Sequence, residues 1–221
     1  MKKVIILIIL LCCGGYIFLG EMLHKESYKS PIIHKNIKDN ELVLVNKENG
    51  VDKDYQDDKL VIPNIRFNNS SSNEEKHVSK RIAKSLEEMF KDAKNEGIIL
   101  LGNSGYRSYK SQVQTYNNRV QSEGKKMADA YVAKPGFSEH QTGLCIDIRN
   151  EGKYFAKGTK EADWLNDNCY KYGFIIRYPE GKESVTGISY EPWHVRYVGK
   201  EAAKIIHNQN ITLEEYLRDK A

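Results

Sequence analysis

The sequence predicts an α+β fold in which a small antiparallel sheet packs against helices. Two observations support this class: helix-like and strand-like segments alternate irregularly along the chain, and the strand-like segments are short and carry polar residues. Neither fits the regular alternation of a doubly wound α/β protein. With 221 residues, of which 40% are hydrophobic, the chain can bury one good core.

The N-terminal segment differs in character from the rest. Lys2 and Lys3 precede an uncharged, mostly apolar stretch over residues 4–20, at the lower limit of the roughly 17–25 residues that a spanning helix needs. The two lysines predict a cytoplasmic N-terminus. We therefore expect residues 1–23 to form a signal anchor, a membrane helix that leaves the domain on the extracytoplasmic face. A cleaved signal peptide, and hence secretion, is the alternative.

A polar segment separates the anchor from the domain. Residues 24–55 are rich in Lys, Asn and Asp and lack a clear period, apart from a strand-like stretch at 42–45. We interpret them as an extracytoplasmic tether. The domain then covers residues 56–221, and its first apolar stretch is at 60–67.

Helix signals dominate the first half of the domain. Ser72 and Glu75 match a capping box, and apolar residues then recur at helical spacing up to Gly97, a plausible C-cap. Gly124 would end a second helix, and Pro135 disfavours helix in the residue before it. The expected elements are a helix over 74–97, a buried strand at 98–101, and helices over 110–123 and 125–132.

The second half alternates strands with shorter helices. Gly173 would end one helix, and Thr212 with Glu215 repeats the capping-box pattern at the last one. After the strand-like run that ends at residue 148, the expected elements are a helix over 161–172, a strand at 174–178, a turn-rich loop at 179–187, a strand at 191–198 and two short C-terminal helices.

Charge and cysteine usage narrow the class of protein. The 34 basic and 30 acidic residues give a net charge of +4, without the basic stripe of a nucleic-acid binder, so no nucleic acid is expected as a partner. We expect a monomer. Outside the N-terminal segment the cysteines are Cys145 and Cys169, which we interpret as small buried hydrophobes, with a disulfide as the alternative.

Three side chains suggest a metal site. His140 and Asp147 lie in the strand-like run "GFSEHQTGLCIDI" at 136–148, where they would be costly to bury without a partner. His194 lies in a separate strand signal. Zinc in catalytic sites takes three such side chains and leaves one position for water. Gly143 allows a tight turn between the first two.

Glu191 precedes His194 by three residues, in "EPWH". On an ideal strand these two side chains would point to opposite faces. Pro192 is typical of bulges and edges, so a break in the strand between them is credible. Glu191 would then lie beside the metal and could act as a general base.

These motifs resemble a known family. "SGYRS" (104–108) with Gln112, "PGFSEHQTGLCIDI" (135–148) and "RYPEGKESVTGISYEPWHVRYVG" (177–199) are similar to the VanY-like zinc D-alanyl-D-alanine carboxypeptidases. This group of LAS peptidases includes L,D-carboxypeptidases. Its pattern S-x-H-x-x-G-x-A-x-D and E-x-x-H is matched over about residues 55–205. Cys145 stands where Ala is usual; the residue stays small, but a thiol near zinc is open to oxidation or to inhibitory metals.

The resemblance implies a role for each matched residue. His140, Asp147 and His194 would bind Zn²⁺, and Glu191 would be the general base. Arg107 would face the scissile carbonyl, with Gln112 and Ser138 near the substrate. The alternatives for the last three are an ion pair, a solvated side chain and a turn cap.

The function implied is hydrolysis of the terminal D-alanine from peptidoglycan stem peptides by a membrane-anchored zinc carboxypeptidase. A peptidoglycan metallo-endopeptidase and a non-catalytic cell-wall-binding relative are the alternatives. The sequence leaves D,D or L,D specificity open, as well as the preference for penta- or tetrapeptides.

Overall fold

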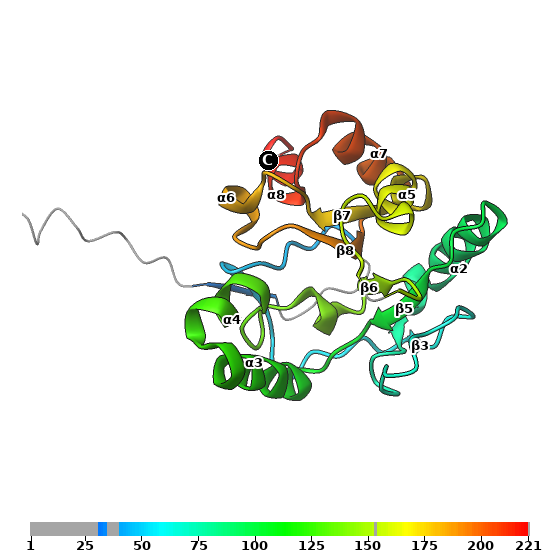
Figure 1. Cartoon of the computed structure of the whole chain (residues 1–221). Helices are drawn as coiled ribbons and strands as arrows, with labels where there is room; N and C mark the ends of the chain where they lie inside the picture. Colours follow the sequence, from blue (N-terminus) through cyan, green and yellow to red (C-terminus); the bar gives the residue numbers. More distant parts are fainter. Residues whose placement is uncertain (1–30, 35–39, 153, 221) are drawn as a thin grey trace, which may run out of the picture. The chain divides into compact units, whose positions relative to one another are not determined.

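The computed structural model describes residues 31–34, 40–152 and 154–220 (Figure 1). The predicted signal anchor lies outside these residues. In the described part of the chain, no helix is both long and apolar enough to cross a membrane. The body that starts at residue 32 contains the whole candidate site.

A four-stranded antiparallel sheet forms the centre of this body, in the order β5-β6-β8-β7. The strands are β5 (Leu101–Ser104), β6 (Cys145–Arg149), β7 (Phe174–Tyr178) and β8 (Glu191–Tyr197). Two strand pairs lie outside it: β1 (Ile32–His34) is parallel to β2 (Asn49–Val51), and β3 (Leu60–Val61) is antiparallel to β4 (Val78–Ser79). The α+β class with a small antiparallel sheet is confirmed.

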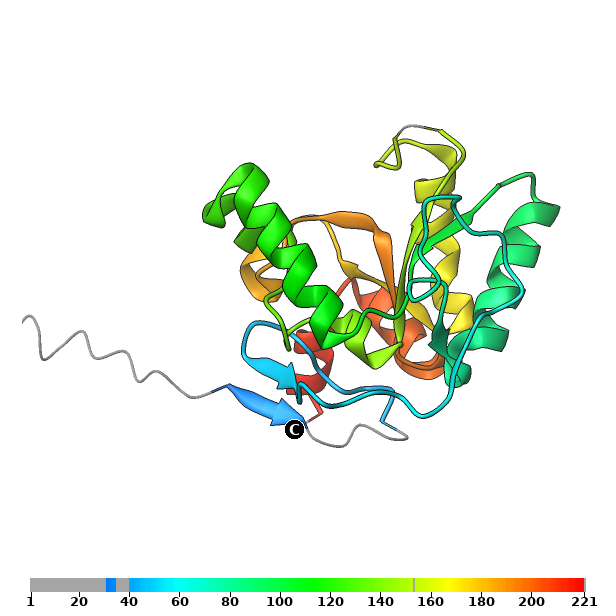
Figure 2. The ribbon, with the colours of Figure 1, turned by 90° about the horizontal axis from the view of Figure 1, so that it is seen from below.

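One face of the central sheet packs in the hydrophobic core, and the other carries the candidate site. Ile146, Ile148 and Val195 are fully buried in the main core, together with the apolar stripe of α2 (Lys80–Asn95). Burying one such side chain contributes about 1.5–3 kcal/mol. Because successive strand residues point to opposite faces, Cys145, Asp147 and His194 point away from this core. Figure 2 shows α2 on one side of the sheet and the α3–α4 pair on the other.

The helices largely follow the sequence signals. The remaining ones are α3 (Tyr109–Glu123), α4 (Lys125–Tyr131), α5 (Lys160–Asn168), α6 (Glu183–Thr186), α7 (Lys200–Gln209) and α8 (Leu213–Arg218), and the 3-10 turn η2 (Cys169–Tyr172) continues α5. The helices expected over 110–123, 125–132 and 161–172 are confirmed to within about two residues. Thr212 and Glu215 form the predicted capping box. The expected loop at 179–187 contains the short helix α6.

The helix predicted over 74–97 begins later. Ser72 and Glu75 do exchange capping hydrogen bonds, but these close a turn rather than start a helix. Val78 instead pairs with Val61 in the β3–β4 ladder, and α2 starts after Ser79, whose hydroxyl accepts from the Arg81 backbone N–H. Tertiary pairing thus overrides the local helical pattern.

The strand predicted at 98–101 is displaced toward the C-terminus. Pairing with β6 begins only where Leu101 meets Arg149 and runs to Ser104. Ile98 and Leu100 still pack against the core, which explains the apolar pattern. The displacement places Ser104 opposite Asp147, at the edge of the candidate site.

The described part of the predicted tether packs on the domain. Val43, Val45 and Val51 are buried in the main core. The buried Arg196 side chain donates to the carbonyls of Glu41 and Val43, at 2.9 and 2.8 Å. The structured domain therefore includes residues 40–55, upstream of the expected boundary at residue 56.

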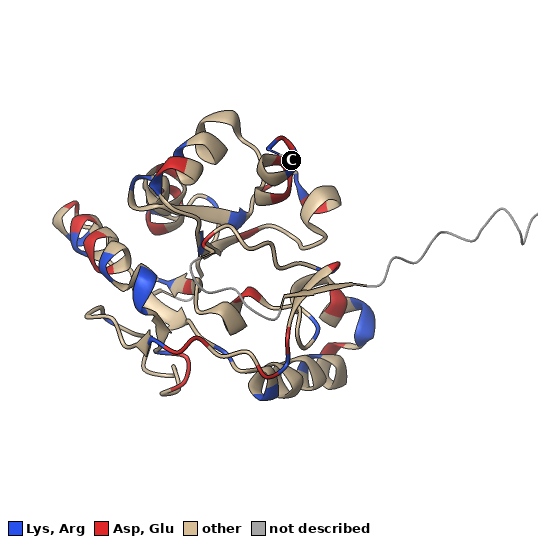
Figure 3. Cartoon of the chain, turned by 180° about the vertical axis from the view of Figure 1, so that it is seen from behind, with Lys and Arg blue, Asp and Glu red and all other residues tan. Residues whose placement is uncertain are grey.

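Charges of both signs are distributed over the helices. Figure 3 shows Lys and Arg interspersed with Asp and Glu, for instance along α2. The charged groups that concern function lie at the sheet instead.

Candidate functional site

The β6–β8 ladder brings two of the predicted ligands together. Asp147 and His194 are direct partners in its register. His194 Nδ1 lies 3.0 Å from Asp147 Oδ1. The His194 ring is buried, whereas the Asp147 side chain keeps 18% of its surface exposed. The pair thus opens toward solvent on the aspartate side.

His140 reaches the same point from a turn. The strand-like run containing it was expected to be extended, but residues Glu139–Thr142 form a 3-10 turn, and only 145–149 are strand. Gly143 closes the turn in the left-handed region (φ 67°), where a Cβ would lie 2.9 Å from the Ser79 nitrogen. His140 Nε2 consequently lies 3.6 Å from Asp147 Oδ2.

Hydrogen bonding orients the His140 ring. Its Nδ1 donates to the Gly105 carbonyl at 2.6 Å, so we assign the proton to Nδ1 and a free lone pair to Nε2. The backbone at Gly105 approaches closely, because a Cβ there would lie 2.3 Å from the His77 carbonyl oxygen. The lone pair therefore faces the aspartate.

A buried carboxylate orients the His194 ring. Its Nε2 lies 3.3 Å from Glu139 Oε2, to which it donates. Burial raises the pKa of Glu139, but Arg196 and Arg177 outweigh this and hold it well below its ordinary value. Glu139 is therefore an anion that accepts from Nε2, so in the neutral His194 ring, the form that binds a metal, the lone pair is on Nδ1 and faces Asp147.

The donor set fits a divalent cation such as zinc. Two imidazole lone pairs converge on a carboxylate, and each ring donates its other N–H to an oxygen, as metal-bound histidines do. Burial raises the pKa of Asp147, but positive charge on the neighbouring imidazoles outweighs this and lowers it to about 2; when the rings are neutral, a bound cation supplies that charge. Asp147 is thus an anionic donor at neutral pH.

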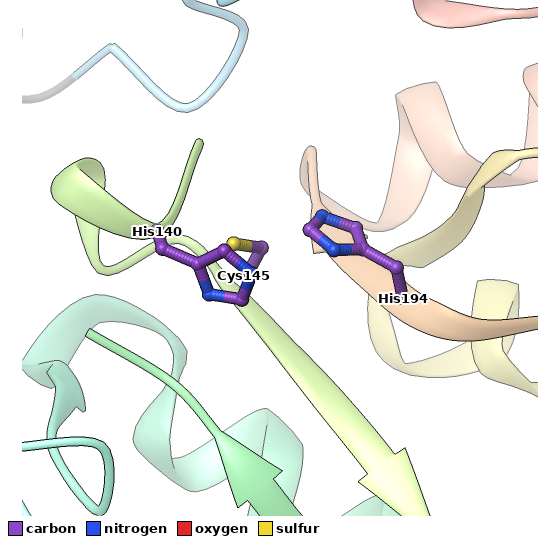
Figure 4. A group of neighbouring side chains, drawn as sticks. All are labelled: His140, Cys145 and His194. Carbon is purple, nitrogen blue, oxygen red and sulfur yellow. The ribbon is translucent and has the colours of Figure 1, made fainter. Parts of the chain in front are cut away.

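Cys145, which the sequence placed near the metal but not among its ligands, is a further potential donor at this point. Ligand atoms of His140, Cys145 and His194 all lie within 4.8 Å of one another (Figure 4). The side chain is fully buried. Burial raises the pKa of the Cys145 thiol, but positive charge on the two imidazoles outweighs this and lowers it to about 7. Both cysteines of the domain are buried and free, so the alternative disulfide does not form.

Glu191 lies beside the cluster, as the predicted strand break requires. Tyr178 pairs with Glu191 and Ile176 with Val195, so β8 is irregular between these positions. Glu191 Oε2 is consequently 4.0 Å from His194 Nδ1. Burial is the main cause that raises the pKa of Glu191 to about 7.

Arg107 enters the site from a loop that is fixed by backbone hydrogen bonds. Its N–H donates to the His140 carbonyl at 3.1 Å. Its guanidinium donates to Gln112 Oε1 at 3.0 Å and to Ser104 Oγ at 2.8 Å. Gln112 is itself buried and donates to the Ala133 carbonyl. Gln112, expected near the substrate, thus holds Arg107, which keeps further N–H groups for a ligand.

These residues line one pocket of about 380 Å³. Ser138 is buried in its wall and makes no side-chain capping hydrogen bond. The lining residues include Arg107, Gln112, Thr115, Arg119, Tyr131, Ser138, His140, Asp147, Tyr178, Glu191, Trp193 and His194. All seven residues predicted for the site are therefore brought together. A larger hollow beside α2, of about 740 Å³, contains no His or Cys.

Comparison with known proteins assigns the family. The family model for VanY, D-alanyl-D-alanine carboxypeptidase, matches residues 75–200. The chain belongs to the VanY family. Curated relatives include the putative carboxypeptidase YodJ of Bacillus subtilis, 45% identical, with 80% of this chain and 67% of the relative covered. A D-alanyl-D-alanine carboxypeptidase of Enterococcus faecalis is 37% identical, with 80% and 65% covered.

Solved structures agree with this VanY assignment. The LdcB LD-carboxypeptidase superposes with a TM-score of 0.79 at 42% identity, covering 87% of this chain and 92% of LdcB. A mutant of the vancomycin-resistance D,D-pentapeptidase VanY, in complex with Zn(II), gives a TM-score of 0.69 at 36% identity, with 80% and 98% covered. The chain spans about two thirds of the length of the two curated relatives.

Proposed function

We propose that this protein is a zinc-dependent carboxypeptidase that removes the terminal D-alanine from peptidoglycan stem peptides. The observation that carries the proposal is the convergence of His140, Asp147 and His194 beside Glu191 in one pocket. The carboxypeptidase relatives and the zinc complex of a VanY enzyme support it. Fixed donors, a carboxylate and a cation in a partly enclosed pocket form a site for hydrolysis.

Zinc would be held by His140 Nε2, His194 Nδ1 and the Asp147 carboxylate. When bound, zinc acts as a Lewis acid that polarises a carbonyl and lowers the pKa of water from 15.7 toward about 7. Glu139 and the Gly105 carbonyl keep the two rings in the required tautomers.

Glu191 would move the proton. Its carboxylate accepts a proton from the attacking water and delivers it to the amine of the departing D-alanine. The side chain is buried and 4.0 Å from His194 Nδ1, so it lies within reach of the reaction centre without being hydrogen-bonded to the ring.

Arg107 would stabilise the oxyanion. Its guanidinium is oriented by Gln112 and Ser104, so its charge is placed before substrate arrives. Preorganised charge of this kind typically contributes about 10²–10³ in rate. Ser138 lies in the same wall and is available to hydrogen-bond the substrate.

The two solved relatives cleave different bonds, and each bond is a candidate for this protein. The similarity to LdcB, greater than that to the VanY pentapeptidase, favours an L,D bond, in which D-alanine follows the diamino acid of a tetrapeptide. Cleavage of D-alanyl-D-alanine in a pentapeptide is the second candidate.

One experiment tests both candidates. Full-length protein is incubated with defined tetra- and pentapeptide stems, with and without a chelator, and the products are weighed by mass spectrometry. We expect loss of a single D-alanine that the chelator prevents. Release of an internal fragment would instead favour the endopeptidase, and no product from either stem would favour a non-catalytic relative.

We also propose that residues 1–23 anchor the protein in the membrane and leave the domain outside the cytoplasm. The charge pattern of Lys2 and Lys3 before the apolar stretch supports this. Cell fractionation should recover the full-length chain with membranes, whereas a shortened soluble protein would favour cleavage and secretion.

A further inference from the structure

We propose that the Cys145 thiolate is a fourth protein donor to the metal ion of this site, alongside His140, Asp147 and His194. The proposal deepens the proposed function, because it concerns how the same pocket binds its ion. It predicts a sulfur-containing coordination sphere in place of one built from nitrogen and oxygen alone.

The strand geometry directs the thiol into the site. Cys145 and Asp147 are two residues apart on β6, so their side chains leave the same face of the sheet. His194 is paired with Asp147, and one of its ring nitrogens lies within 4.8 Å of the Cys145 sulfur on this face. The core residue Ile146, between the two, points the other way.

The donor atoms are close enough to share one ion. Ligand atoms of Cys145 and of both histidines lie within 4.8 Å of one another. Two donors of one tetrahedral zinc ion, each about 2.0–2.3 Å from it, are roughly 3.3–3.8 Å apart, so a small inward movement of the side chains brings all three to ligating distance. Figure 4 shows the three side chains converging from the 3-10 turn, β6 and β8. Because the thiol is fully buried, it has no alternative partner in solvent.

A thiolate would change the chemistry of the centre. Sulfur is a softer ligand than carboxylate or imidazole and favours softer ions such as cadmium over the harder ones. Four protein donors also complete a tetrahedral set, which is typical of closed sites, whereas three leave a position for water. Because hydrolysis needs that position for water, the proposal requires an open form with Cys145 released beside the closed, thiolate-bound form. Coordination of the thiol releases its proton.

Cobalt spectroscopy tests this independently of activity. The full chain has four cysteines, so a variant carrying Cys12→Ser, Cys13→Ser and Cys169→Ala keeps Cys145 as its single thiol. After chelator treatment it is loaded with one equivalent of Co²⁺. We expect a near-ultraviolet thiolate-to-cobalt charge-transfer band in addition to the visible ligand-field bands. Further replacement of Cys145 by Ala should abolish the charge-transfer band alone.

Each outcome decides the proposal. Binding of one equivalent of cobalt without the charge-transfer band in the single-thiol variant overturns it, and so does persistence of the band after Cys145→Ala. A lower preference for Cd²⁺ over Zn²⁺ in Cys145→Ala than in the single-thiol variant would support it. Stem-peptide assays on the same variants separate the two proposals. Hydrolysis without the band removes only the thiolate ligand. The band in the single-thiol variant, with no hydrolysis by either that variant or Cys145→Ala, removes only the proposed function.

Discussion

Two groups of buried charges lie on opposite sides of the His194 ring, and they are built differently. One is the metal pocket around His140, Asp147 and Glu191. The other, which we call the ion cluster, consists of Glu139, Arg177, Arg196 and Glu214. In the ion cluster Glu139 accepts from both arginines, at 2.8 and 2.6 Å, and Arg177 also donates to Glu214 at 2.7 Å.

The two groups differ in whether their polar atoms find hydrogen-bond partners within the protein. The remaining donors of the ion cluster meet backbone carbonyls at residues 41, 43, 45 and 197, so its charges are compensated within the protein. In the pocket the imidazole lone pairs and the carboxylates face one another instead. A group of buried charges therefore indicates a functional site only where lone pairs without a partner in the protein can bind a ligand. His194 belongs to both groups, because Glu139 fixes its ring.

The largest loss of activity should come from removing a metal ligand. His140→Ala removes one imidazole donor, so we expect bound zinc, measured by atomic absorption, to fall to a small fraction of the wild-type content and hydrolysis to be lost. Stability should fall as well, because the ring is buried against His194 and donates to the Gly105 carbonyl, so zinc content is compared under conditions where the variant is folded. The exposed His207, replaced by Ala, is the matched control. Unchanged zinc content in His140→Ala would exclude this residue from the metal site.

Glu191→Gln should separate chemistry from metal binding. A general base typically contributes about 10²–10⁴ in rate, so kcat should fall by this factor while zinc content and melting temperature stay at wild-type values. Glu183→Gln, at an exposed position, is the control. A variant at Glu191 that turns over stem peptide near the wild-type rate would refute the assignment of the base.

Disrupting the ion cluster should lower the free energy of unfolding. Glu139→Ala leaves two buried arginines without their shared carboxylate, and breaking such a pair costs about 3–5 kcal/mol in the free energy of unfolding. Urea denaturation measures this. Zinc affinity should also fall, by about 10–100-fold, because Glu139 no longer orients His194. A stable variant with unchanged zinc affinity would show that the cluster does not support the pocket.

The same contrast explains what the sequence could reveal. A His and an Asp in an apolar strand pattern are recognised as costly to bury, and this reasoning finds His140 and Asp147. Arg177 in "FIIRY" and Arg196 in "HVRYV" obey the same rule, yet their partner Glu139 lies on a turn and Glu214 on the last helix, so only the fold pairs them. The available signal was a fully charged arginine inside a strand pattern.

Local patterns predicted elements better than their boundaries. The periodicity of α2 is visible in the sequence, but its first residue depends on Val78 pairing with Val61, a contact between distant segments. Residues 40–55 are too polar to suggest a core segment, although Val43 and Val45 in the strand-like stretch are buried. The carbonyls of this stretch serve the arginines of the ion cluster, and such a role leaves no trace in side-chain chemistry.

Glu214→Ala gives the smallest and most discriminating effect. Glu214 accepts from Arg177 and from Asn46, but its side chain is 13% exposed, so water can replace it in part. Arg177 also keeps Glu139 as a partner. We expect a loss of about 1–3 kcal/mol in urea denaturation, smaller than for Glu139→Ala, and wild-type zinc affinity and kcat under conditions where the variant is folded. A fall in kcat without a loss of stability would mean that the ion cluster tunes the reaction as well as the fold, and the distinction between the two buried groups would then fail.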